Sequence, residues 1–399
     1  MKRLLIALIL AGVAAPAAAQ RGVDDEYGRF ELMAPDTNSY RIIYDISMTT
    51  AGAKTFVSRM GNIAQMRDIA VIDRMTGQPL RFDRATNELR IQLARAVPTG
   101  GEARLRVAVT YRDARIYYQE AGKIVFSMPF DGPRNAIVLP PGFELVQSDV
   151  PVQVLEEADG RIVASFMNTF PDRANVLIKA RPLAARATPA PAAGAAPTPP
   201  VADAPVREQP MNQIRVAERA IQDREIVYFL KEPDTHAFSL YHDYTAAREG
   251  EHQYVNVVRA GSSVSEPSAK ILDTGEVLKT RTLTGADVVR EKIDIPDRVE
   301  PDTQLVLIPF APVKKGESVR LRISETYTDP ARYALVDGQL MWHRSFGRPR
   351  NDMVLPAGWF LTTTSIPAVI TQEPDGRIRL SYWNPRPDNI DVFVKGRRR

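Results

Sequence analysis

One stretch of this chain decides the fold because it is written twice. It reads GPRNAIVLPPGFEL at Gly132–Leu145 and GRPRNDMVLPAGWFL at Gly347–Leu361, so Arg350 stands 350 − 134 = 216 positions after Arg134. In each version Pro fixes a turn, a short apolar run is typical of a buried strand, and a Pro-x-Gly sequence turns the chain again. The pattern predicts a structural corner built once in each half of the chain.

The Arg-Asn pair inside this corner has two possible roles. In the structural interpretation, Asn135 and Asn351 and their preceding arginines bond neighbouring carbonyl groups. In the alternative, the pairs Arg134-Asn135 and Arg350-Asn351 hold a ligand. All four residues are therefore candidates for a binding site.

Two further matches extend the repeat along both halves. Ala34–Lys54 matches Glu232–His252 at an offset of 198, and the segment from Arg104 matches the one from Arg320 at an offset of 216. The second half thus carries 216 − 198 = 18 extra residues, which we place within positions 262–301. Ordered matches of this length indicate an internal duplication, and two copies are too few for a solenoid.

The local pattern is that of β-strands throughout. Alternating apolar residues, rich in β-branched and aromatic types, are separated by Gly, Pro, Asp and Asn. The Ala/Pro-rich segment 182–210 predicts a solvated linker between the copies. We therefore predict an all-β protein: two tandem antiparallel β-sandwiches at 20–181 and 211–399, with a single short helix over Asn212–Glu225.

The first 20 residues predict export. Lys2 and Arg3 precede an apolar run from Leu4 to Ala15, and an Ala-x-Ala site lies before Gln20, as in a cleaved signal peptide of residues 1–19. A periplasmic or extracellular location follows. No other run approaches the roughly 18 apolar residues that a spanning helix needs, so we expect no transmembrane segment in the mature chain.

Composition excludes several classes of protein. The chain has no Cys, so disulfide and thiolate chemistry are absent. Its 52 Lys and Arg against 48 Asp and Glu give +4, and removing Lys2 and Arg3 leaves 50 − 48 = +2. A net charge this small does not predict a basic surface for binding nucleic acid.

The sequence contains no H-E-x-x-H, G-x-S-x-G, Walker loop or G-x-G-x-x-G. We expect no cofactor. The pattern L.I.L followed by GE..rLrV.vtY, which ends at Tyr111, resembles the N-terminal β-domain of M1-type aminopeptidases. The resemblance covers about a hundred residues in each half, and it implies a shared sandwich without the zinc-binding helical domain.

All histidines lie in the second half, and their spacing does not bring them to one point, so we predict no metal site. They are His236, His242, His252 and His343.

Some positions carry residues of different chemical type in the two copies. Such positions are candidates for a function that one copy has and the other lacks. All three Trp lie in the second half, and Trp383 stands where the first half has Met167. Ile378, Leu380 and Tyr382 form the core face of that strand, so Trp383 and Arg379 should point outward. An exposed indole stacks on sugar rings and other planar ligands, which makes these two residues candidates for ligand binding.

The same comparison singles out a buried polar pair. His242 and Glu325 fall on the core faces of their strands, at positions where the first half has Tyr44 and Val109. A buried carboxylate needs a partner. We predict that the two side chains share one interior, in contact or joined through a Tyr hydroxyl or a water, unless a bulge turns Glu325 outward.

Three functions remain open. The first is non-catalytic binding of a protein or of an envelope polymer. The second is carbohydrate binding through Trp383. The third is an enzyme that uses Asp113 and Asp329, although these carboxylates are equivalents in separate copies and a catalytic pair must converge. The sequence leaves the oligomeric state open.

Overall fold

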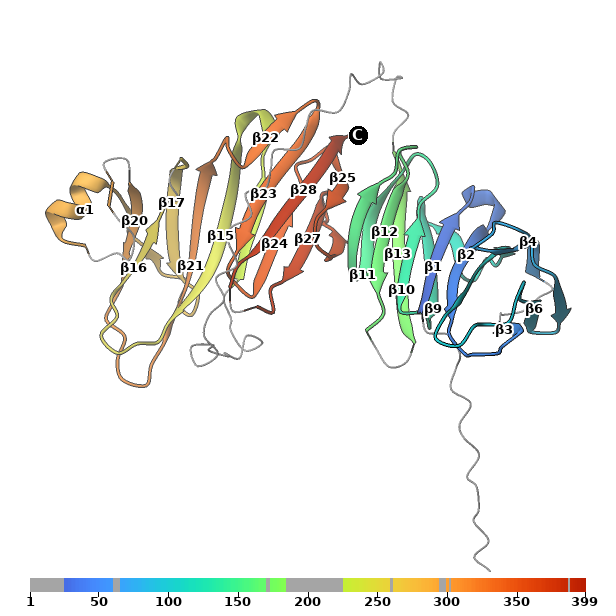
Figure 1. Ribbon diagram of the computed structural model, residues 1–399. Helices are drawn as coiled ribbons and strands as arrows, with labels where there is room; N and C mark the ends of the chain where they lie inside the picture. The colour runs from blue at the N-terminus through green and yellow to red at the C-terminus, as the bar shows by residue number, and fades with distance from the viewer. Residues whose placement is uncertain are drawn as a thin grey trace, which may run out of the picture. The chain divides into compact units, whose positions relative to one another are not determined.

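The computed structural model describes residues 25–59, 65–169, 173–183, 225–258, 261–293, 299–300, 303–386 and 388–399. Across these residues it has 28 strands, the α-helix α1 and two short 3-10 helices (Figure 1). The predicted all-β class is confirmed. The signal peptide 1–19, nearly all of the linker 182–210 and the helix predicted over 212–225 lie outside the described residues and stay predictions; Glu225 itself begins a strand.

The chain forms two compact units. Among the described residues, one unit combines 25–28 with those of 43–109, and the other combines Arg29–Ile42 with those of 110–399. This division does not fall at the Ala/Pro-rich segment, so the domain boundaries from the sequence remain a prediction. Three strands contribute residues to both units: β1 (Asp25–Leu32), β2 (Ser39–Met48) and β7 (Ala103–Arg112).

The smaller unit contains a three-stranded antiparallel sheet in the order β3–β6–β5. Phe56, Leu89 and Ile91 alternate with exposed residues and are buried, as expected of strands with one face on a core. The strands of this unit are β3 (Thr55–Arg59), β4 (Met66–Asp73), β5 (Phe82–Ala85) and β6 (Glu88–Gln92).

The first half of the larger unit has two antiparallel ladders, β8–β9–β13–β11 and β10–β12–β11. Aromatic rings fill its core: Phe130 meets Phe30 and Phe166 edge to face, at centroid distances of 4.8 and 5.1 Å. The elements are the 3-10 helix η1 (Pro35–Thr37), β8 (Tyr117–Glu120), β9 (Lys123–Phe130), β10 (Arg134–Val138), β11 (Phe143–Glu156), β12 (Ile162–Met167) and β13 (Ala174–Pro182).

The second half of the larger unit has three sheets. The central one runs β26–β27–β24–β14–β15–β21–β17–β18, with β14 and β24 parallel; the others are β22–β23–β28–β25 and β16–β20–β19. The first elements are β14 (Glu225–Leu230), η4 (Pro233–Thr235), β15 (Ala237–Ala246), β16 (Gln253–Val257), β17 (Ser263–Ile271), β18 (Val277–Leu278), β19 (Arg281–Thr284), α1 (Gly285–Glu291) and β20 (Gln304–Pro309). The others are β21 (Val319–Thr328), β22 (Tyr333–Val336), β23 (Gln339–Phe346), β24 (Arg350–Val354), β25 (Trp359–Thr364), β26 (Ala368–Gln372), β27 (Ile378–Trp383) and β28 (Ile390–Arg398).

Helix α1 was missed by the sequence analysis. It lies in the segment where the offset of the repeat changes, so some of the extra residues of the second half form this helix. Thr284 and Asp287 make a capping box at its start. That pattern is a recognisable signal for a helix N-terminus, although the seven-residue helix is too short for a clear apolar periodicity.

The repeated corner keeps the same hydrogen bond in both halves. The Nδ2 atom of Asn135 donates to the carbonyl of Gly132 at 2.8 Å, and Nδ2 of Asn351 donates to the carbonyl of Arg348 at 2.7 Å. Both Asn side chains are buried. The predicted structural role of the two Asn residues is confirmed.

The two halves also contact each other through strand pairing. β11 pairs with β26 through Ser148–Ile370 and Val152–Ala368, with an irregularity between the two pairs. Nearby, the fully buried Glu144 accepts hydrogen bonds at 2.6 Å from Nε of Arg181 and from Nε of Arg399. The ladder therefore continues from one half into the other.

Candidate functional site

The outer face of the central sheet carries a row of three polar and aromatic side chains. Strand register places Trp383 on β27 opposite Arg350 on β24, and Arg350 opposite Glu225 on β14. Ile378, Leu380 and Tyr382 of β27 are buried, whereas Trp383 is 48% exposed. The predicted outward position of Trp383 is confirmed.

This row borders a groove with a volume of about 630 Å³. Such a volume is typical of small-molecule and cofactor sites, which span roughly 300–1,000 Å³. Apolar side chains and three prolines form much of its wall. The lining residues are Pro151, Glu225, Arg350, Asp352, Ile366, Pro367, Val369, Ser381, Tyr382, Trp383, Pro385 and Ile390.

The charged side chains around the groove differ in how firmly they are held. Nη2 of Arg350 lies 3.8 Å from the Glu225 carboxylate, too far for a hydrogen bond. Arg379 instead makes close contacts with Asp352 at 2.7 Å and Glu373 at 2.5 Å. Of the two arginines predicted to bind a ligand in the second half, Arg350 lines the groove and Arg379 holds Asp352 in place.

The first-half candidates lie apart from the groove lining. Arg134 is exposed and stands opposite Met167 in the ladder of β10 and β12. Asn135 is buried, and its side chain donates the hydrogen bond of the corner to the carbonyl of Gly132. The structure thus brings Trp383 and Arg350 together, and it leaves Arg134 and Asn135 outside that site.

A second polar cluster is formed by buried side chains of β15 and β21 and by Asn256 of β16. His242 and Glu325 are each 2% exposed, so the predicted burial of both is confirmed. Nδ2 of Asn256 on β16 donates to both Glu325 carboxylate oxygens at 3.0 and 2.7 Å, and also reaches the hydroxyl of Tyr327 at 2.9 Å.

The prediction joined His242 to Glu325 directly, through a Tyr hydroxyl or through a water. The first two of these links are wrong, and the water-mediated link stays a prediction. Neither ring nitrogen of His242 has a hydrogen-bond partner, because the carboxylate of Glu325 is turned to Asn256 and Tyr327. The ring of Tyr254 packs against the imidazole with centroids 5.5 Å apart.

Burial sets the charge states in this cluster. It lowers the pKa of His242 well below 6.5, and the positive Arg348 lowers it further. Burial raises the pKa of Glu325, against the opposing hydrogen bonds from Asn256 and Tyr327. His242 is therefore a neutral imidazole near pH 7.

Two members of this cluster were not identified from the sequence. Asn256 shares strand parity with Tyr254, but Val255 and Val257 have the opposite parity and all five residues of β16 are half-buried, so parity does not indicate that Asn256 faces Glu325. Arg348 lies in the turn before β24, where no periodic pattern indicates which way a side chain points.

The carboxylates considered for catalysis are bound to donors in their own halves. Asp113 pairs with Arg115 at 2.7 Å, and this hydrogen bond holds the pKa of Asp113 below its usual range. Asp329 accepts from Ser262 at 2.9 Å and lies 3.4 Å from Arg344. Each carboxylate therefore bonds to groups of its own half, and the two do not converge on one site.

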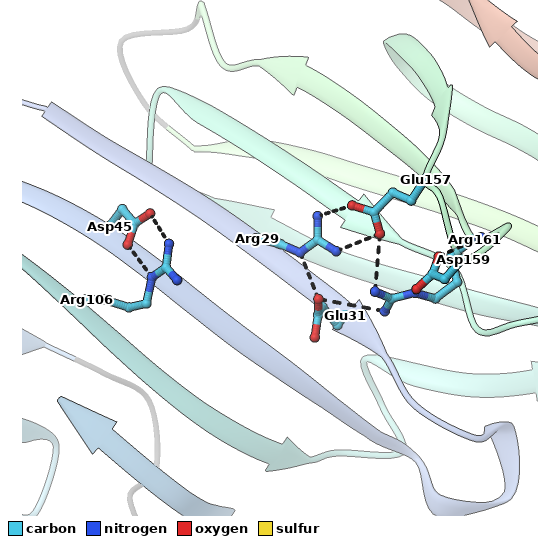
Figure 2. A network of polar contacts seen from close by, with 7 residues as sticks. All are labelled: Arg29, Glu31, Asp45, Arg106, Glu157, Asp159 and Arg161. Carbon is cyan, nitrogen blue, oxygen red and sulfur yellow. Dashed lines mark hydrogen bonds and ion pairs between the residues drawn. The ribbon is translucent and has the colours of Figure 1, made fainter. Parts of the chain in front are cut away.

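Arg29, Glu31, Glu157 and Arg161 form an ion-pair network (Figure 2). Arg29 binds Glu157 through two hydrogen bonds of 2.7 and 2.9 Å, and its guanidinium lowers the pKa of Glu157. Glu157 therefore stays ionised and cannot serve as a proton donor near neutral pH.

In the other unit, Asp45 and Arg106 make a bidentate pair at 2.6 and 2.7 Å, also drawn in Figure 2. The Arg106 guanidinium lowers the pKa of Asp45. The equivalent pair in the second half, Asp243 and Arg322, has distances of 2.8 and 2.9 Å. This pair is part of the repeated framework.

Among the described residues, no three or more His, Asp or Glu side chains come together in a way that would hold a metal ion. Within the same part of the chain, none of the helices has the length and apolar character needed to cross a membrane.

No family model and no curated protein matches the chain. Solved structures of M1 peptidases are similar to part of it. An M1 zinc metallopeptidase from Deinococcus radiodurans is 15% identical, with 40% of this chain and 42% of that chain covered at a TM-score of 0.30. An aminopeptidase N family protein from Idiomarina loihiensis is 8% identical, with 39% and 29% covered at a TM-score of 0.28. The chain spans less than half the length of either protein.

Proposed function

We propose that this chain is an exported, non-catalytic binding protein, built from two tandem copies of one β-sandwich, that binds a protein or polymer of the cell envelope. The signal-peptide pattern supports export, and the repeated Asn hydrogen bonds support the two-copy organisation. We expect it to work without a cofactor and without binding nucleic acid.

One observation carries the proposal: the groove beside Trp383. A half-exposed indole, an arginine outside hydrogen-bond range of its carboxylate neighbour and an apolar wall give a ligand both contact area and polar anchors. Exposed aromatic residues and arginines are the side chains most often found at the centre of binding surfaces.

The state of the carboxylates supports binding over catalysis. A general acid needs a carboxyl group whose pKa is raised and which reaches the substrate. Burial raises the pKa of both Glu325 and Glu156, but Glu325 is buried and bonded to Asn256, and Glu156 is paired with Arg397 at 2.7 Å. The acids considered for catalysis, Asp113 and Asp329, are bound to arginines or hydroxyls.

The test is retention of envelope components by the immobilised mature protein, with Trp383→Ala as the variant. Met167→Ala is the matched control, because Met167 is the equivalent residue of the first half and is 68% exposed. We expect a retained component that is lost with Trp383→Ala and kept with Met167→Ala. Equal retention by all three proteins would refute a role for the groove.

Carbohydrate binding is the second candidate function. The exposed position of Trp383 at the rim of a groove favours it, because indole faces stack on the apolar faces of sugar rings.

A further inference from the structure

We infer that the groove takes a neutral, hydroxyl-rich sugar chain, with one sugar ring stacked on Trp383 and its hydroxyl groups bonded to Arg350 and Glu225. This inference rests on the proposed function, since it names the chemical class of the ligand for the same groove.

The first support is the placement of the three side chains. Trp383, Arg350 and Glu225 occupy one cross-strand row on β27, β24 and β14. Neighbouring strands lie about 4.8 Å apart, so the row sets a stacking platform, a donor and an acceptor at successive steps of about that length. A sugar chain lying across the strands presents a ring and then hydroxyl groups in this order.

The second support is that Arg350 and Glu225 do not hydrogen-bond each other. Arg350 and Glu225 are 3.8 Å apart, so neither one's hydrogen-bonding groups are taken up by the other. A guanidinium only donates and a carboxylate only accepts. A hydroxyl group does both, so adjacent sugar hydroxyls satisfy this donor and this acceptor together.

The third support is the charge of the groove, which selects a neutral chain over an anionic one. Its lining contains the cation Arg350 and two carboxylates, Glu225 and Asp352. Arg379 neutralises Asp352 through a contact of 2.7 Å. Arg350 and Glu225 then balance each other, and the groove has no excess positive charge for a polyanion.

The fourth support is the apolar wall beside Trp383, formed by residues such as Ile366, Pro367 and Pro385. A sugar ring has an apolar face and a polar rim. The apolar wall and the indole contact the apolar face of the ring, and Arg350 and Glu225 hydrogen-bond the hydroxyl groups at its rim. The first half lacks the indole, since Met167 stands at the equivalent position.

The experiment titrates the mature protein with neutral oligosaccharides, namely β-1,4-linked hexamers of glucose and of N-acetylglucosamine, together with glycan strands released from the cell envelope. Trp fluorescence is the readout. Trp342 and Trp359 are each 1% exposed, so acrylamide reports mainly on Trp383. We expect a saturable fluorescence change and protection of Trp383 from acrylamide by at least one of these sugars.

The variants separate stacking from hydrogen bonding. We expect Trp383→Ala to weaken binding at least about tenfold and Trp383→Phe to retain part of the affinity. Arg350→Ala should weaken it by a similar factor through lost hydrogen bonds. Arg134→Ala, the equivalent change in the first half, should leave the affinity unchanged.

The outcomes separate this inference from the proposed function. Absence of saturable binding by every neutral sugar, or equal binding by Trp383→Ala, overturns the sugar site. If an identified envelope protein or anionic polymer is then retained in a Trp383-dependent way, the proposed function stands and only the ligand class is wrong. If nothing is retained through Trp383, both are wrong.

Discussion

Replacement of His242 by Leu should make the second half of the protein more stable. Both ring nitrogens of His242 are buried without hydrogen-bond partners, and an unsatisfied buried polar group costs about 1–3 kcal/mol. Leu is apolar and of similar size, so it removes that cost without leaving a large cavity. At pH 7.5 we expect the free energy of unfolding to rise by about 1–3 kcal/mol.

The advantage of the variant should grow as the pH falls. The folded-state pKa of His242 lies well below 6.5, so below pH 6.5 the unfolded chain binds one proton more than the folded chain. The unfolding free energy of the wild type therefore falls by about 1.4 kcal/mol for each pH unit below 6.5, which gives a loss of about 2 kcal/mol between pH 7.5 and 5.0. Glu325 titrates in both proteins, so its contribution largely cancels in the difference.

The assay is urea denaturation at pH 7.5, 6.5 and 5.0, followed by Trp fluorescence. All three Trp lie in the second half, so the signal reports on the part of the chain that contains His242. The control is His252→Leu, since His252 is exposed. Unfolding free energies of wild type and His242→Leu that stay parallel from pH 7.5 to 5.0 would refute a buried, unpaired, neutral imidazole.

Three further predictions follow from burial and hydrogen bonding. Trp383→Ala should lower the free energy of unfolding by less than about 1 kcal/mol, and Trp342→Ala should lower it by about 3–5 kcal/mol, because only the indole of Trp342 is in the core. Urea denaturation measures both losses. Glu325→Gln should stabilise the protein increasingly as the pH rises above 4.5, because a raised folded-state pKa means stability that is lost with rising pH; a variant that is never more stable up to pH 8 would contradict this. Asn135→Ala and Asn351→Ala should each cost about 1–3 kcal/mol, since each leaves a carbonyl of the corner unpaired; circular dichroism in urea detects the loss, and a cost in one half only would show that the two corners differ.

Strand parity predicted the faces of the decisive residues. Successive side chains of a strand point to opposite sides, so the apolar neighbours of His242 and Glu325 placed both inside, and the same rule placed Trp383 outside. The corner hydrogen bonds of the two Asn residues were also predictable, because they join residues only three positions apart.

The partners of the buried residues were not predictable in the same way. Asn256 lies 69 positions before Glu325 in the chain and belongs to a different sheet. Alternation tells which side of a strand faces a core, but it does not tell which strand of another sheet lies opposite. For this reason the sequence suggested His242 as the partner of Glu325, and the structure has Asn256 instead.

The irregular pairing of β11 with β26 has a consequence for how the two halves behave apart. A strand at the edge of a sheet exposes backbone N–H and C=O groups that recruit other chains, which leads to dimers or aggregates. Here part of each edge is occupied by the other half, at Ser148–Ile370 and Val152–Ala368. Producing the two halves as separate chains would uncover both edges at once. We therefore expect the separated halves to be less soluble than the single polypeptide, because in the intact chain each half covers part of the other's edge.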